Sequence, residues 1–138
     1  MLNINSIEYE IVEDVASVDD FTRLRMISGL TPRPVDAAKR GLLKSLYGVQ
    51  IFIENKSIAM GRVVGDGAIN FDIVDVAVDP AYQGKGFGRI IMQHIMDYLD
   101  REAAKGAYIT LMADVPELYE KFGFKLSRPE CEGMYIHK

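Results

Sequence analysis

The chain has 138 residues, of which 49% are hydrophobic and 26% are charged, and its formal net charge is −4. This length suits one compact domain with an apolar core, so we expect a single domain over residues 1–138. The acidic balance argues against non-specific binding of nucleic acid, which needs clustered cations. No apolar run approaches the ~20 residues that span a bilayer. The N-terminus lacks a signal-peptide pattern, and the single cysteine, Cys131, excludes an internal disulfide and fits a reducing, cytoplasmic setting.

Hydrophobic periodicity and turn residues predict the elements in chain order. The first half reads as a strand, two helices and three strands: Ile7 to Val12, Ser17 to Ser28, Val35 to about Leu46, Val49 to Ile53, Ile58 to Val64 and Ile69 to Val78. The first helix has a plausible N-cap in Ser17 and a stop in Gly29. The two prolines of Gly29–Pro34 exclude regular structure between the helices.

The second half alternates helices and strands. Its clearest helix covers Arg89 to Glu102, where Ile91, Ile95 and Leu99 share one face. Tyr108 to Met112 then reads as a strand, Val115 to Phe122 as a short helix that Gly123 ends, and two short strands finish the chain. This order predicts an α/β or α+β sheet with at least one parallel crossover.

A glycine-rich turn, Gln83-Gly84-Lys85-Gly86-Phe87-Gly88, joins an apolar strand to the helix that starts at Arg89. Glycines let the backbone approach a bulky anion, and the free N–H groups of a helix's first turn bind phosphate. Lys85 and Arg89 add positive charge. The segment therefore predicts a pyrophosphate cradle, although its G-x-G-x-G spacing fits neither the dinucleotide fingerprint nor the P-loop.

Val76 to Pro80 followed by Gln83 to Arg89 resembles the acetyl-CoA motif of the GNAT superfamily, Q/R-x-x-G-x-G/A. Leu118 to Phe124 is similar to that family's late helix-turn-strand signature, so the resemblance covers residues 49–136. It implies a mixed, mostly antiparallel sheet with a central parallel splay, flanked by about four helices, and acetyl-CoA as cosubstrate. Residues implied in binding it are Val76, Ala77 and Val78 for the pantetheine and Gln83, Gly84, Lys85, Gly86, Phe87, Gly88 and Arg89 for the pyrophosphate.

The reaction that the resemblance implies is direct attack of a neutral amine on the acetyl thioester, which requires a general base. Tyr119 matches the family tyrosine that protonates the departing thiolate. Asp72 and Asp75 are the base candidates, because a carboxylate in an apolar strand is costly unless it is paired or functional. Alternation places them on opposite faces unless a bulge intervenes, so we expect only one to face the site. The alternatives are a water relay, or structural ion pairs with Arg62 or Arg25.

Other polar residues carry weaker signals. We expect Leu30 to Pro34 and Tyr47 to lie across the acceptor side, where Arg33 would bind an anion or remain a solvated loop residue. Glu130 or Glu132 would reach the rim of the cleft. His94 reads as a packed or solvated helix residue. The widely spaced His94, His137 and Cys131 give no metal-ligand pattern, so no metal is expected.

These features predict an acetyl-CoA-dependent N-acetyltransferase that acts on a small-molecule amine. A looser resemblance, from Gly61 to Gly67 and again at Gly133 to Tyr135, is to the arylalkylamine (serotonin) N-acetyltransferase-like subgroup. Two alternatives remain open: a CoA-binding regulatory module without turnover, and a protein N-terminal acetyltransferase. A homodimer is compatible with the implied fold, and no membrane or nucleic-acid partner is expected.

Overall fold

The computed structural model describes residues 1–138 and contains one six-stranded sheet in the order β1-β2-β3-β4-β5-β6. The strands are β1 (Leu2–Ile4), β2 (Ile7–Val12), β3 (Tyr47–Ile53), β4 (Lys56–Gly65), β5 (Asn70–Val78) and β6 (Tyr108–Leu111). Every neighbouring pair is antiparallel except β5 and β6, which are parallel. The predicted mixed, mostly antiparallel sheet with one parallel crossover is confirmed.

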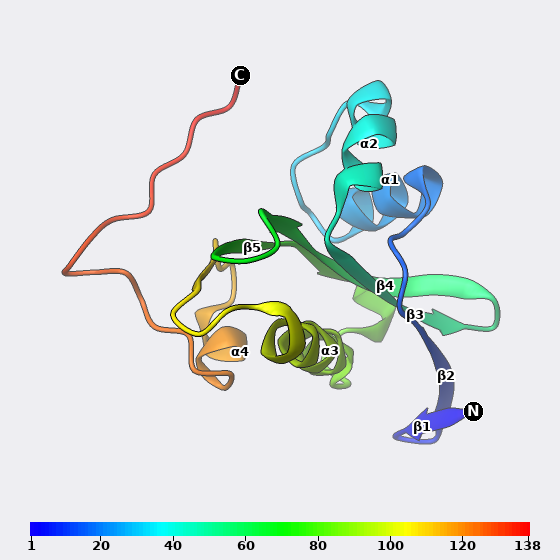
Figure 1. Ribbon diagram of the computed structural model, residues 1–138. Coiled ribbons are helices and arrows are strands. Elements are labelled where there is room, and N and C mark those ends of the chain that lie inside the picture. The colour runs from blue at the N-terminus through cyan, green and yellow to red at the C-terminus, as the bar shows by residue number, and fades with distance from the viewer.

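Four α-helices flank the sheet: α1 (Val18–Ile27), α2 (Val35–Gly41), α3 (Phe87–Glu102) and α4 (Pro116–Glu120). Short 3₁₀ turns, η1 (Leu42–Lys44) and η2 (Pro80–Tyr82), follow α2 and β5. Figure 1 shows α1 and α2 on one side of the sheet and α3 and α4 on the other. No helix is long and apolar enough to cross a membrane.

The caps of α1 show how local sequence sets an element's limits. The Ser17 side chain accepts a hydrogen bond from the Asp20 N–H at 3.1 Å, which satisfies a first-turn donor. At the other end Gly29 has φ +85°, a conformation that glycine adopts without strain. Both predicted ends of this helix are confirmed.

The face that α3 covers holds the larger core, and its buried members are all hydrophobic. Ile91 and Ile95 of α3 lie directly on Gly61 of β4, where an added Cβ would come within 2.7 Å and 2.9 Å of their side chains. The helix therefore packs tightly on the centre of the sheet. A smaller cluster lies under α1 and α2 on the opposite face.

The prediction of two short strands at the C-terminal end is wrong. Residues 121–138 contain no strand, and Met134, Tyr135 and Ile136 are exposed. A turn closed by the Cys131 N–H to the Ser127 carbonyl precedes a tail that extends away from the sheet (Figure 1), so its apolar residues have no strand to pair with. The N-terminal β1 was not predicted, and α2 ends sooner than expected, at Gly41.

Candidate active site

The parallel pair β5 and β6 separates partway along β5. The two strands pair only from Asn70–Ile73 to Tyr108–Leu111, whereas β5 continues to Val78 with β4 as its sole neighbour. The side of Val74–Val78 that faces away from β4 is therefore an open edge. Unpaired strand backbone offers N–H and C=O groups to an extended ligand that carries amides. The predicted pantetheine residues, Val76 to Val78, lie on this open edge.

A bulge interrupts β5 at its centre. Asp75 and Val76 together stand opposite the single residue Gly61 of β4, and Asp75 has φ +58°. The extra residue shifts the alternation, because Phe71 and Ile73 before it belong to the α3-side core and Val76 after it packs against that same core. Asp72 and Asp75 consequently share the face of α1 and α2. The expectation that only one aspartate faces this side is wrong, since the bulge offsets their odd spacing.

Asp75 is held by two arginines. One carboxylate oxygen lies 2.5 Å from Arg25 Nη1 and the other lies 2.6 Å from Arg62 Nε. The side chains of Asp75 and Arg25 are almost fully buried, with 7% and 6% exposure. The structural ion pairs considered for this residue are thus present. With both oxygens engaged, Asp75 is poorly placed to accept a proton, whereas Asp72, the other predicted base candidate, has no arginine on its carboxylate.

Asp72 is half-buried and has no cation beside it. Its nearest polar partner is the Thr110 hydroxyl on β6, 3.3 Å away. Burial raises the pKa of Asp72, and the negative charge of Asp75 adds to the effect. The sequence does not predict the contact with Thr110, because only the parallel register of β5 with β6 brings the two residues together.

The glycine-rich turn forms an open cradle of backbone donors. The six N–H groups from Gly84 to Arg89 donate to no carbonyl or side chain of the protein. Gly86 is the N-cap of α3 with φ +96° and provides no side chain to satisfy them. The positive end of the α3 dipole adds to the attraction for an anion. Phe87 differs from its neighbours, since its side chain is buried in the core and only its backbone faces the cradle.

The cradle, the open edge and α4 meet at one point. Gln83 Nε2 donates to the Val78 carbonyl at 3.0 Å, which ties the turn to the end of β5. At Gly88 an added Cβ would lie 3.6 Å from Leu118 of α4 and 3.8 Å from Val78. An extended ligand with its phosphates on the cradle would therefore run along the open edge with α4 beside it.

Tyr119 lies on α4, directly after Leu118. Its ring packs against the core and meets Phe124 edge-on at 6.4 Å, while its hydroxyl makes no hydrogen bond within the protein. Burial, followed by the negative charge of Asp114, raises the pKa of Tyr119 above its usual 10.0. The phenol thus keeps its proton at neutral pH and is available as a donor.

Several expected site residues lie elsewhere. Tyr47 lies on the α3 side of the sheet, where it stacks on Tyr98 at 4.6 Å, because its position on β3 points it toward the larger core. His94 is half-buried on α3, 3.9 Å from Glu13. Glu132 pairs with Arg128 in the exposed C-terminal turn, and no hydrogen bond joins Glu130 to the site.

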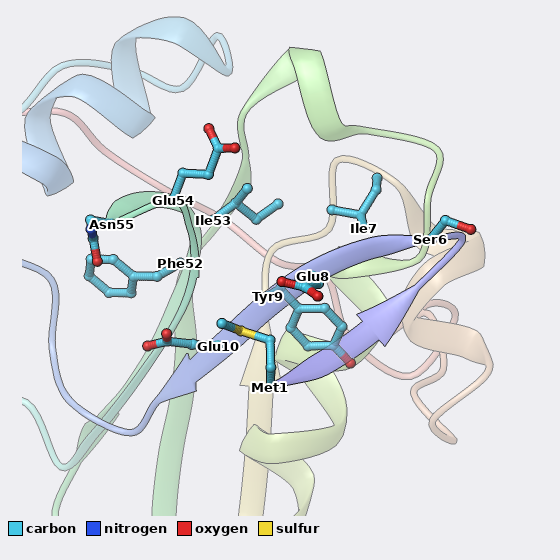
Figure 2. Close-up of a pocket in the computed structure, with 10 residues that line it drawn as sticks. All are labelled: Met1, Ser6, Ile7, Glu8, Tyr9, Glu10, Phe52, Ile53, Glu54 and Asn55. Carbon is cyan, nitrogen blue, oxygen red and sulfur yellow. The ribbon is translucent and has the colours of Figure 1, made fainter.

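One hollow in the surface lies away from this site. It has a volume of about 450 Å³ and lies between the N-terminal hairpin and the turn after β3 (Figure 2). Glu8, Glu10 and Glu54 line it. Carboxylates repel phosphate, so this hollow does not suit an anionic cofactor.

Comparison with known proteins agrees with the geometry. A family model described as an acetyltransferase (GNAT) domain matches residues 48–126. A crystal structure from Staphylococcus aureus, of a protein of unknown function described as a probable acetyltransferase, is 39% identical with a TM-score of 0.91, over 95% of this chain and 100% of that one.

Curated plant relatives are longer. A soybean (Glycine max) protein named histone acetyltransferase TAP1 is 36% identical over 67% of this chain and 40% of its own length. A rice protein named serotonin N-acetyltransferase 2, chloroplastic, is 28% identical over 60% of this chain and 42% of its own. The chain spans about a third to two fifths of the first three plant relatives. Because the family model matches more than half of the chain, this protein belongs to the GNAT family of acetyltransferases, which generally use acetyl-CoA as the acetyl donor.

Proposed function

We propose that this protein transfers the acetyl group of acetyl-CoA to the primary amine of a small molecule. The observation that carries the proposal is the run of six unpaired N–H groups from Gly84 to Arg89, set at the end of an open strand edge. Backbone donors at a helix N-terminus suit a pyrophosphate, and the edge suits the amides of pantetheine. Lys85 and Arg89 supply cations at the same place.

The chemistry assigned to the side chains follows from their protonation states. An ammonium has no lone pair, so the acceptor amine must lose a proton before its nitrogen attacks the thioester carbon. Asp72 takes that proton, directly or through water, and its raised pKa makes it a stronger base than an ordinary aspartate. The nitrogen attacks the thioester carbon, the carbon–sulfur bond breaks, and Tyr119 donates its proton to the leaving sulfur. The nitrogen then loses its second proton, which returns through water to the Tyr119 phenolate, so that the amide and the free thiol are formed.

A small acceptor is supported by how the α1 and α2 face is covered. The loop from Leu30 to Pro34 is tied down at Thr31, whose carbonyl accepts from Arg25 Nε at 2.9 Å. Because Arg25 also pairs with Asp75, this contact fixes the loop beside the bulge of β5. A loop fixed there leaves less room for a peptide than for a compact molecule. A protein acceptor is the second candidate, favoured by the name of the soybean relative.

A thiol-release assay with acetyl-CoA tests the proposal on small amines, polyamines and peptides with free N-termini. We expect turnover on at least one small amine and little on the peptides. Tight CoA binding without turnover on any acceptor would instead identify a regulatory CoA-binding module. Faster turnover on peptides than on every small amine would favour a protein acetyltransferase.

A further inference from the structure

Three arginines gather around the bulge of β5, on the face of α1 and α2. Arg25 comes from α1, Arg62 from β4, and Arg33 from the loop between the two helices. Both Arg62 and Arg33 lie near enough to Arg25 that their repulsion helps lower its pKa, after the larger effect of burial and against the attraction of Asp75. Only two carboxylates, Asp75 and Asp72, stand on this face of β5. The site therefore carries excess positive charge.

The hydrogen-bonding capacity of these arginines is unevenly used. All three nitrogens of Arg25 have partners, because Nη1 binds Asp75 while Nε and Nη2 both donate to the Thr31 carbonyl. Arg62 donates from Nε to Asp75 and from Nη1 to the Ser45 hydroxyl at 3.1 Å, and its Nη2 has no protein partner. Arg33 makes only long contacts to backbone carbonyls, at 3.3 Å and 3.4 Å, and no ion pair. Arg62 and Arg33 thus keep donors for a ligand.

The bulge lies where the proposed reaction would take place. A cofactor held at the cradle and laid along the open edge runs from Val78 back toward Ile73, where pairing with β6 closes the edge. Its acetyl end would then lie near the bulge. The α3 side of this point is filled by the apolar core, so the acceptor must approach from the α1 and α2 face. There it meets Asp72 and the three arginines.

We propose that the acceptor amine carries an anionic group, a carboxylate or a phosphate, which Arg62 Nη2 and the Arg33 guanidinium bind. This inference rests on the proposed function and narrows its substrate class. Guanidinium groups bind both anions through charge-assisted hydrogen bonds. The anion would neutralise the excess charge of the arginines, while Asp72 faces the amine at the other end of the molecule. Opposite charges at the two ends orient the substrate.

Matched pairs of amines test this directly. Ethanolamine is compared with O-phosphoethanolamine, and ethylamine with β-alanine, in the thiol-release assay at saturating acetyl-CoA. We expect kcat/KM to be about tenfold or more higher for the anionic member of at least one pair. The phosphate pair and the carboxylate pair show which anion is preferred.

Two variants link the preference to the arginines. Arg33→Gln and Arg62→Gln should each reduce the ratio of kcat/KM between anionic and neutral amines by about tenfold, with little change in KM for acetyl-CoA. Arg62→Lys keeps a positive charge near Asp75 but lacks the Nη2 donor. A reduced ratio in this variant therefore comes from loss of the anion contact and not from disturbance of the bulge. Arg40→Gln is the control, since Arg40 is an exposed arginine of the neighbouring α2, and it should leave the ratio unchanged.

Calorimetric titration of O-phosphoethanolamine into the CoA-loaded protein makes the outcome independent of turnover. If O-phosphoethanolamine binds and Arg33→Gln weakens that binding, the anion site is supported. If in addition no amine is acetylated, the proposed function is wrong and the anion site still stands. Turnover on neutral amines with no preference for the anionic partners overturns the anion site and leaves the proposed function standing. Absence of both turnover and binding overturns both.

Discussion

The two faces of the sheet differ in the kind of side chains that are buried on them. Under α3 lies the larger hydrophobic cluster, which runs from Tyr9 to Leu99 in the sequence, and the helix touches the strands at Gly61. Under α1 and α2 the apolar cluster is smaller, and a nearly buried ion pair, Arg25 with Asp75, lies beside it. The first face supplies the apolar burial that holds the fold together. The second face replaces part of that apolar burial with a pair of charged side chains.

The bulge of β5 is the cause of this division. Without the extra residue at Asp75, strand alternation would turn that carboxylate into the apolar core under α3. An unpaired charge there would be strongly unfavourable. With the bulge, Asp75 reaches Arg25 and Arg62 instead, and the same distortion lies just after Ile73, where pairing with β6 stops. The contrast between the faces therefore depends on one backbone irregularity.

The largest expected effect comes from removing the charge that balances the second face. Asp75→Asn keeps the size of the side chain and tolerates the positive φ, but it leaves two partly buried guanidinium groups without a counter-ion. We expect the free energy of unfolding in urea to fall by about 3 kcal/mol. Arg128→Gln, which breaks an exposed pair with Glu132, is the control and should leave the midpoint unchanged. Equal effects of the two variants would contradict the division between the faces.

The second-largest effect is expected at the cradle, where a substitution should weaken the binding of CoA. Gly86→Asp adds a carboxylate where phosphate is expected and a side chain at φ +96°, 3.1 Å from Ile4 Cδ1. We expect the Kd for CoA, measured by calorimetry, to rise more than about 100-fold. Gly106→Asp is the matched control, because Gly106 also has positive φ (+88°) but lies in the turn before β6. A normal Kd in Gly86→Asp would remove the pyrophosphate from this turn.

Tyr119→Phe tests the proton donor beside the cradle. Loss of a general acid should lower kcat about 100-fold with little change in KM for acetyl-CoA. Since burial raises the pKa of Tyr119 above 10.0, deprotonation of this acid should lower the wild-type rate only as pH rises through that raised value. Tyr135→Phe, in the exposed tail, is the control. A kcat within twofold of wild type would exclude Tyr119 as the acid.

The smallest expected effect concerns stability and pH at Asp72. Its raised pKa means that the folded state binds this proton more tightly than the unfolded state, so wild-type stability falls as pH rises through the raised value. Asp72→Asn should therefore be slightly more stable at pH 7, by less than about 1 kcal/mol after solvent screening. This gain should vanish below pH 3.8, the ordinary value.

Asp66→Asn is the control for that measurement, because its effect on stability at pH 7 should have the opposite sign. Three backbone N–H groups lower the pKa of Asp66 to about 2, so its contribution to stability is present above pH 3.8 and is lost as pH falls through about 2. Urea unfolding between pH 2 and pH 7 compares the two variants. Curves that change in the same direction would contradict the different surroundings assigned to these aspartates.

Local sequence determined a large part of this protein. The caps of α1, the amphipathic α3 and the glycine-rich turn depend on residues within a few positions of one another, and each formed as expected. The expected C-terminal strands did not form, because a strand needs a partner edge and the turn at Ser127–Cys131 leads the tail away from the sheet. Alternation of residues reports which face would be buried, but not whether an edge is available.

The sequence alone also identified Asp72, Asp75 and Tyr119 as the residues to test, because a carboxylate in an apolar strand and a tyrosine in the late motif are local signals. Only the tertiary structure decided what surrounds them. It placed both aspartates on one face through the bulge, engaged Asp75 with arginines 50 and 13 residues away, and set Thr110 beside Asp72. Such contacts depend on strand register and helix docking, which arise when distant segments pack together.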